Sequence, residues 1–155
     1  MANHTKMIVT DLDDTLLRND KTISDFTVQT LIKCQAAGIK IAYATARSAQ
    51  ASMKYLDRFT PDIFIGYGGA LVMTGNEIIF RFDISADVAD KLIKMCLSEP
   101  AVIGIHAINE AIALSSYPEP DMRHYRLTDF SSDYGKSYLK ISLSASDQTT
   151  TTYIK

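Results

Sequence analysis

Three short runs of β-forming residues mark the first half of the chain. Residues 6–10 (KMIVT) and 39–44 (IKIAYA) are almost continuously apolar, and residues 62–66 (DIFIG) form a third run. Such runs are typical of strands that are buried on both faces of a sheet. The pattern therefore predicts three buried strands.

Amphipathic stretches separate these runs. Ser24 can cap a helix whose apolar positions, Val28, Leu31 and Ile32, recur at helical spacing until Gly38 supplies a stop signal. A second helix is expected between the second and third runs. Strands and helices that alternate in this order predict right-handed crossovers and a parallel sheet, in which ligands bind beyond the carboxyl ends of the strands.

The pattern changes after the third run. Residues 70–73 (ALVM) and 77–82 (EIIFRF) flank a Thr-Gly-Asn turn, which predicts a β-hairpin. A new helix is then expected, capped by Ser85 and ended by Pro100. Its predicted apolar face consists of Val88, Leu92, Met95 and Cys96.

Strands and a loop follow this helix. The strands are expected at residues 101–107, 110–116 and 138–144. Residues 117–135 are predicted to form a loop that can hold a helical turn, and the residues after Ser146 resemble an element cut short. The predicted fold class is therefore α/β: a Rossmann-like parallel-sheet core over residues 1–82 with an inserted α+β domain over residues 83–155, both incomplete.

Composition and charge narrow the class of protein. With 155 residues, 46% hydrophobic and 22% charged, the chain can bury a sizeable core. A net charge of −2 gives no broad positive field, which argues against nucleic acid and membranes as partners. No apolar run is long enough to span a bilayer, no secretory signal is found, and Cys34 and Cys96 lack CxxC spacing. We therefore expect a soluble, cytoplasmic protein with reduced thiols.

Two carboxylates stand two residues apart where the first strand is expected to end. Asp11 and Asp13 could both turn toward one site, an arrangement that suits phosphoryl transfer. One carboxylate can attack phosphorus to form an aspartyl-phosphate, while the other protonates the leaving oxygen and then activates water. Their mutual repulsion implies a cation, and Mg²⁺ prefers such oxygens. A solvated turn is the alternative interpretation.

A hydroxyl follows the second strand in the same way. Thr45, with the backbone amides after it at the start of a helix, could bind a phosphoryl oxygen. Such a residue is usually only a helix cap. It becomes a candidate here because a parallel sheet would bring it beside Asp11.

These motifs resemble those of one family. The sequence DLDDTLL (residues 11–17) resembles the DxDxT signature of the haloacid dehalogenase superfamily, and YATARS (residues 43–48) resembles its second motif. The order of elements is similar to that of the Cof-type branch, in which Ile-Ser opens the first helix, a Gly-Gly-Ala turn (residues 68–70) precedes a hairpin, and an α/β cap follows. The resemblance covers essentially the whole chain.

The resemblance implies roles for matching residues. Asp11 would be the nucleophile and a magnesium ligand, and Asp13 the general acid and base and a ligand through its backbone carbonyl. Thr45 would bind the transferring phosphoryl group, together with the backbone amides of Leu12, Asp13 and Ala46.

Other positions keep two interpretations each. Arg47 would either bind the leaving group or be a solvated residue of the first helical turn. Thr15 would steady the acidic loop by hydrogen bonds, and Asp14 is expected to take no part in catalysis. The glycines at 68 and 69 would permit a tight turn, with or without substrate contact.

Two further family motifs are missing: a lysine that offsets phosphoryl charge and a later acidic pair that completes the magnesium site. Lys136 and Lys140 come too early to replace that lysine, and the resemblance places Lys155, the last residue, within the cap. The strand at residues 6–10 would be left with an open edge. We therefore expect a fragment of a longer protein, or a chain that covers this edge by self-association.

The predicted function is Mg²⁺-dependent hydrolysis of phosphomonoesters, with small phosphorylated metabolites, most often sugar phosphates, as substrates. One alternative is a signalling receiver domain, which would require regular βα units to the end of the chain. The other is a truncated, non-catalytic fragment that binds metal or phosphate only weakly.

Overall fold

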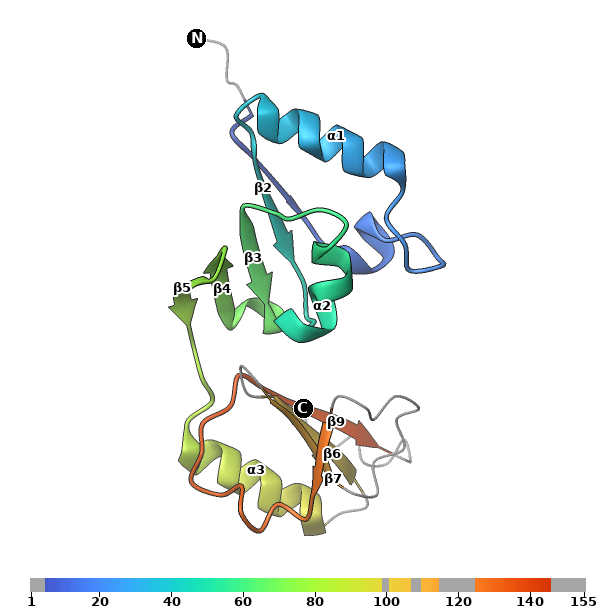
Figure 1. The fold of residues 1–155 in the computed structure, drawn as a ribbon. Coiled ribbons are helices and arrows are strands. Elements are labelled where there is room, and N and C mark those ends of the chain that lie inside the picture. Colours follow the sequence, from blue (N-terminus) through green and yellow to red (C-terminus); the bar gives the residue numbers. More distant parts are fainter. Residues whose placement is uncertain (1–4, 99–100, 107–109, 115–124, 146–155) are drawn as a thin grey trace. The chain divides into compact units, whose positions relative to one another are not determined.

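The structure, a computed structural model, describes residues 5–98, 101–106, 110–114 and 125–145. The chain divides into two units, Met1–Phe82 and Asp83–Lys155. Each unit has its own sheet (Figure 1). They are described separately below.

The first unit is built on a five-stranded mixed sheet in the order β1-β2-β3-β4-β5. Its strands are β1 Met7–Thr10, β2 Lys40–Ala44, β3 Ile63–Gly66, β4 Leu71–Thr74 and β5 Glu77–Arg81. The first three strands are parallel, and β3, β4 and β5 pair antiparallel. The predicted parallel strands and hairpin are thus confirmed, and the hairpin departs from the regular βα succession of a receiver domain.

Two crossover helices, α1 (Asp25–Ala36) and α2 (Ala49–Leu56), connect the parallel strands (Figure 1). Ile41 and Tyr43 project from one face of β2 into a cluster that also contains Val28 of α1 and Tyr55 of α2. Both helices therefore cover the same face of the sheet, as right-handed crossovers in one direction require.

The first helix follows its sequence signals closely. Ser24 caps α1, because its hydroxyl oxygen accepts the Thr27 N–H at 3.0 Å. Gly38 follows the helix with φ +82°, a conformation that favours glycine. Of the predicted apolar positions, Val28 and Leu31 are buried, whereas Ile32 is 45% exposed.

The first strand is not buried on both faces, which corrects the prediction. β1 lies at one edge of the sheet, and Met7 and Val9 are 44% and 56% exposed. Ile8, on the face covered by the helices, packs against the core instead. The described residues cover neither the face of β1 that carries Met7 and Val9 nor its outer edge. The predicted open edge is therefore present.

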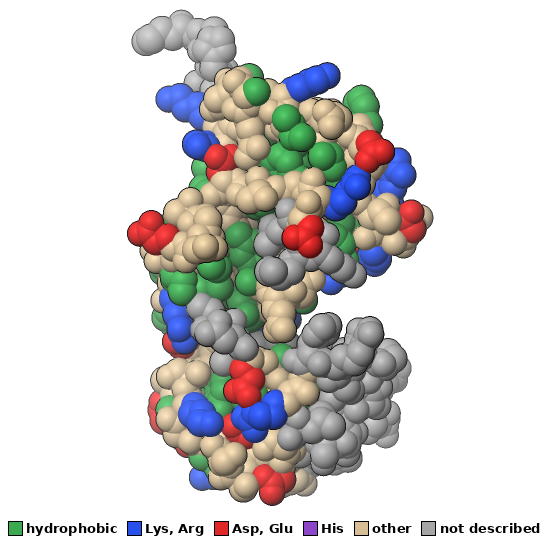
Figure 2. All heavy atoms as spheres, viewed as in Figure 1, with side chains coloured by type: hydrophobic (Ala, Val, Ile, Leu, Met, Phe, Trp, Pro, Cys, Tyr) green, Lys and Arg blue, Asp and Glu red, His purple; other side chains and the backbone are tan. Residues whose placement is uncertain are grey.

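Apolar residues also reach the surface at the opposite edge. Ile79, Phe80 and Phe82 are each more than half exposed, and apolar side chains are visible over β4 and β5 at the left of Figure 2. Acidic and basic side chains are interspersed on the face shown there. No helix among the described residues is long and apolar enough to cross a membrane, and Cys34 is a partly buried free thiol.

The second unit packs one helix, α3 (Ala86–Ser98), on a four-stranded sheet in the order β8-β7-β6-β9. Its strands are β6 Ala101–His106, β7 Ala111–Leu114, β8 Tyr125–Thr128 and β9 Lys140–Ala145. β6 pairs antiparallel with β7 and β9, and β7 pairs parallel with β8. A helix followed by four strands is the order of an α+β module.

Two predictions for this unit were wrong. α3 buries Ala89 and Ile93 completely, whereas Val88 and Met95 of the predicted face are 43% and 58% exposed. The predicted loop at residues 117–135 contains β8, whose partner strand β7 is distant enough in sequence to leave no local signal. The side chain of Cys96 and the element expected after residue 145 lie outside the described residues.

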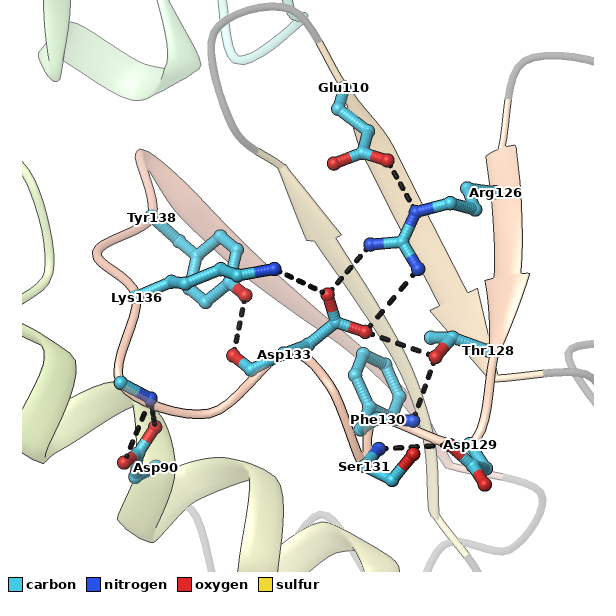
Figure 3. Close-up of polar contacts among 11 residues, drawn as sticks. Asp90, Glu110, Arg126, Thr128, Asp129, Phe130, Ser131, Asp133, Lys136 and Tyr138 are labelled. Carbon is cyan, nitrogen blue, oxygen red and sulfur yellow. Dashed lines mark hydrogen bonds and ion pairs between the residues drawn. The ribbon is translucent and has the colours of Figure 1, made fainter.

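A fully buried carboxylate organises the segment between β8 and β9 (Figure 3). Asp133 accepts hydrogen bonds from Arg126 Nη2 at 2.6 Å, Thr128 Oγ1 at 3.0 Å and Lys136 Nζ at 3.2 Å. The Tyr138 hydroxyl donates to the Asp133 carbonyl at 2.7 Å. Burial raises the pKa of Asp133, but the hydrogen bonds from Arg126, Lys136 and Thr128 outweigh it, so the pKa lies below its ordinary value.

Candidate active site

The carboxyl ends of the parallel strands bring the candidate residues together. β1, β2 and β3 end at Thr10, Ala44 and Gly66, and register pairs Thr10 with Tyr43 and Ala44 with Ile65. A hollow of about 320 Å³ opens at this edge. It is lined by Asp11, Ala44, Thr45, Ala46, Ile65, Gly68 and Gly69. The expected neighbourhood of Asp11 and Thr45 is thus present in the first unit.

Asp11 opens a wide helical turn over Leu12–Leu16. Its Oδ1 accepts the Leu12 N–H at 2.6 Å, so this amide, expected to face a phosphoryl group, holds the carboxylate of Asp11. The Leu17 N–H closes the turn on the Leu12 carbonyl at 2.8 Å, and both leucine side chains are buried. The buried leucines anchor the loop while Asp11 remains exposed.

Asp14 provides the irregular backbone of this loop. Its φ is +54°, a left-handed conformation that Asp tolerates better than most residues. Its side chain is 88% exposed and 3.5 Å from Lys21 Nζ. Thr15 is exposed, and its hydroxyl makes no hydrogen bond with the described residues, contrary to the expected stabilising role.

Asp13 is paired with Arg47 rather than lining the hollow. Arg47 Nε donates to Oδ2 and Arg47 Nη2 to Oδ1, both at 2.7 Å, and Lys21 Nζ lies 3.3 Å from Oδ1. The hydrogen bond from Arg47 lowers the pKa of Asp13 to about 2 in spite of partial burial, with a smaller contribution from Lys21. The carboxylate is therefore ionised at neutral pH, the form that accepts a proton.

Several contacts fix Arg47. Its guanidinium carbon lies 5.3 Å from the centroid of the buried Tyr55 ring, its carbonyl accepts the Tyr67 N–H at 2.9 Å, and its N–H donates to Thr45 Oγ1 at 3.2 Å. The hydrogen bond to Asp13 raises its pKa. Its side chain is 28% exposed, so the solvated interpretation does not describe it.

Thr45 is tied to the neighbouring strand. Its N–H donates to the Ile65 carbonyl at 2.9 Å, its carbonyl accepts the Gly68 N–H at 3.1 Å, and it is buried. Gly68 and Gly69 have φ of +69° and +101°, which confirms that this turn needs glycine-compatible backbone. The turn forms one wall of the hollow.

Sequence reasoning missed three residues around the acidic loop: Lys21, which contacts Asp13; Tyr55, beneath Arg47; and Tyr67, whose amide binds the Arg47 carbonyl. Tyr67 has φ +54°, unusual for an aromatic residue. All three act through contacts that form only when the loops fold, and no residue pattern in the sequence signals them.

The oxygen atoms available here suit a hard cation. The Asp11 carboxylate and the Asp13 backbone carbonyl are ligand types that Mg²⁺ prefers, with water completing its octahedron. Within the part of the chain that the structure describes, no group of three or more His, Cys, Asp or Glu side chains could hold a metal ion. These residues therefore fit part of a magnesium site.

Comparison with known proteins agrees with this geometry. Residues 8–154 match the family described as haloacid dehalogenase-like hydrolase. The chain belongs to this family. The family resemblance drawn from DLDDTLL and YATARS is thereby confirmed.

Curated relatives in the haloacid dehalogenase-like family are longer proteins. HMP-PP phosphatase from Enterobacter sp. (strain 638) is 29% identical over 129 residues, which are 77% of this chain and 47% of that protein. HMP-PP phosphatase from Cronobacter sakazakii (strain ATCC BAA-894) is 25% identical over the same proportions of the two chains. The chain thus spans less than half the length of the curated relatives it matches.

Solved structures show the same fold. A haloacid dehalogenase-like hydrolase from Bacteroides thetaiotaomicron aligns with a TM-score of 0.76 at 22% identity, covering 87% of this chain and 56% of that chain. A subclass IIB sugar phosphatase aligns with a TM-score of 0.74 at 19% identity, covering 90% of this chain and 58% of that chain. At these identities the likeness establishes the α/β fold alone.

Proposed function

We propose that this chain carries the nucleophile half of a Mg²⁺-dependent phosphomonoester hydrolase that acts on small phosphorylated metabolites, with sugar phosphates the favoured class. The observation that carries the proposal is the hollow shared by Asp11 and Thr45, with Asp13 in the adjoining turn. Asp11 can act as the nucleophile, Thr45 as the phosphoryl-binding group and Asp13 as the proton-transfer group.

The chemistry follows from these positions. An oxygen of Asp11 attacks phosphorus, a P–O bond to Asp11 forms, and the bond to the leaving alkoxide breaks. Asp13, once protonated, gives its proton to that oxygen, and then takes a proton from the water that hydrolyses the aspartyl-phosphate. Arg47 occupies one lone pair on each carboxylate oxygen of Asp13 and Lys21 a second on Oδ1, which leaves the other lone pair of Oδ2 for this transfer.

The phosphoryl oxygens need donors and charge compensation. The Thr45 hydroxyl and the amides of Asp13 and Ala46 are assigned to these oxygens, and Arg47 to the leaving group. The Asp11 carboxylate and the Asp13 carbonyl would hold Mg²⁺. When bound, the ion offsets the negative charge of Asp11 and of the phosphoryl group.

The unit after Phe82 is assigned as the cap that screens the substrate. The names of relatives support phosphorylated substrates: one is an HMP-PP phosphatase and another a sugar phosphatase. A non-catalytic fragment that binds metal or phosphate weakly is the second candidate, favoured by the span of less than half of the curated relatives.

Hydrolysis of p-nitrophenyl phosphate with and without Mg²⁺ tests the proposal. Asp11→Asn should reduce magnesium-dependent turnover at least a thousandfold, because the amide is a poor nucleophile. Asp14→Asn makes the same charge change three residues away on an 88% exposed side chain and should leave turnover within about twofold. Equal activity of Asp11→Asn and the unsubstituted chain would refute the assignment, and an inactive unsubstituted chain would establish the non-catalytic alternative.

A further inference from the structure

A second and larger hollow lies in the first unit, apart from the lining of the first. It measures about 400 Å³ and lies between the loop that precedes α1 and the end of α2. Arg18 and Lys21 contribute from the loop, Asp25 from the first turn of α1, and Tyr55 and Arg58 from α2 and the residues after it. None of the residues assigned to catalysis lines it.

The hollow has an apolar floor and a basic rim. Ile23 and Tyr55, both in its lining, are 4% and 3% exposed, so their side chains form a fixed base. Arg18, Lys21 and Arg58 supply three positive charges, against one carboxylate, that of Asp25. An apolar base with a few convergent charged groups is the usual composition of a small-molecule site.

Hydrogen bonds hold the loop that forms this rim. The Arg18 N–H donates to the Thr22 carbonyl at 2.9 Å, and the Lys21 N–H donates to the Arg18 carbonyl at 2.8 Å. The carboxylate of Asp20 accepts from the Thr22 N–H at 3.0 Å and from its hydroxyl at 2.7 Å. Both bonds from Thr22 reach Asp20 Oδ1, and they fix this turn of the loop. The hydrogen bonds from Thr22, and after them the positive charge of Arg18, lower the pKa of Asp20, so Asp20 is an acidic neighbour of Arg18 outside the lining of the hollow.

The carboxylate in the lining does not cancel the positive charge. Asp25 is bonded to Arg58 Nη2 at 2.6 Å, which joins the loop to the end of α2 and leaves the other guanidinium donors of Arg58 for a ligand. The Arg18 side chain makes no hydrogen bond with the described residues. At the N-terminus of α1, Ser24 accepts the Thr27 N–H, so this amide is not available to a ligand.

We propose that this hollow binds a small organic anion: a phosphate or carboxylate group, held by Arg18 and Arg58, on a flat apolar body that rests on Tyr55 and Ile23. Lys21 also lies on the rim, while its Nζ is 3.3 Å from Asp13 Oδ1. An anion here would compete with Asp13 for this ammonium group. The site does not depend on the proposed phosphatase activity.

Nuclear magnetic resonance of the ¹⁵N-labelled chain without Mg²⁺ can test the site, with phenylphosphonate, benzoate and inorganic phosphate as probes. Saturable shifts are expected at the amides of Arg18, Lys21 and Thr22, separately from those of Gly68 and Gly69 in the first hollow. Phenylphosphonate and benzoate distinguish the two anionic groups. Both organic anions should bind more tightly than inorganic phosphate, because only they can cover the apolar floor.

Arg18→Gln should weaken binding by about tenfold, the usual effect of losing one charge-assisted hydrogen bond, and Arg58→Gln should do the same. Lys33→Gln, which makes the same charge change on the exposed surface of α1, should leave affinity unchanged. Shifts confined to the first hollow, or equal affinity in Arg18→Gln, Arg58→Gln and Lys33→Gln, would overturn the proposal. Loss of phosphatase activity by Asp11→Asn with these shifts intact would show that the two sites are independent.

Discussion

Removing the buried carboxylate of Asp133 should destabilise the second unit more than any other single charge change in its loop. The carboxylate is fully buried and accepts from Arg126, Thr128 and Lys136 at 2.6–3.2 Å. Charge-assisted hydrogen bonds contribute about 1.5–3 kcal/mol each before compensation. Asp133→Ala removes all of these acceptors at once.

The expected loss of stability is smaller than the sum of these hydrogen bonds, because the partners of Asp133 can find other contacts. Removing one partner of a buried pair costs about 3–5 kcal/mol when the remaining charge is stranded without water. Here the side chains of Arg126 and Lys136 are 40% and 51% exposed, so both can turn to solvent, and Arg126 retains Glu110 (Figure 3). We therefore expect Asp133→Ala to lower the free energy of unfolding by about 2–3 kcal/mol.

Urea unfolding followed by amide resonances of Ile112 in the second unit and Ile41 in the first measures the effect where it occurs. Asp129→Ala is the matched control, because this residue of the same loop is exposed and its carboxylate bonds the neighbouring Ser131, whose N–H it accepts at 2.9 Å. The Ile41 signal should not change in either variant. A loss below about 0.5 kcal/mol at Ile112, or equal losses in Asp133→Ala and Asp129→Ala, would refute the reasoning.

The pKa of Asp133 adds a pH dependence with a defined sign. A carboxyl whose pKa is lower in the folded state contributes stability above its unfolded pKa, and this stability is lost as pH falls through the folded value. Hydrogen bonds from Arg126, Lys136 and Thr128 outweigh the burial that raises the pKa of Asp133. Acidification below about pH 4 should therefore weaken the second unit, and less so in Asp133→Asn.

Three further predictions concern the first unit. Hydrogen bonds from Lys40, the Ile41 N–H and Gln35 lower the pKa of Asp62 to about 2, so the stability of the first unit should fall as the pH drops from about 4 to 2. In Asp62→Asn, circular dichroism should show a smaller loss of stability over this range. Gly68→Ala should cost about 1 kcal/mol in urea unfolding, because φ is +69° while a Cβ meets no atom within 4 Å; no loss would show that the turn relaxes. Val9→Lys should reduce concentration-dependent association in sedimentation velocity, and unchanged association would exclude the β1 edge as its cause.

Local sequence signals were enough to predict much of the first unit. The cap at Ser24, the glycine at 38 and the hairpin turn at residues 74–76 each act within a few residues, so their consequences could be predicted from the chain alone. The placement of Asp11 near Thr45 needed one further step, the rule that parallel strands end at one edge of a sheet.

The wrong or missed predictions share a physical cause: tertiary contacts, rather than local sequence, decide which face, partner or strand forms. α3 has apolar residues around much of its circumference, so periodicity alone does not decide which face is buried. The face with the small Ala89 beside Ile93 is fully buried in the structure, whereas Val88 and Met95 are exposed. The pair of Asp13 with Arg47 spans 34 residues, and β8 is a four-residue strand beside a distant partner. Neither has a local signature.

Every residue that lines the hollow of Asp11 lies before Phe82, in the first unit. The residues of this hollow and the proposed cap therefore occupy consecutive, non-overlapping stretches of the chain. Substitutions beyond Phe82 could change which substrates a cap admits without replacing any residue that lines this hollow.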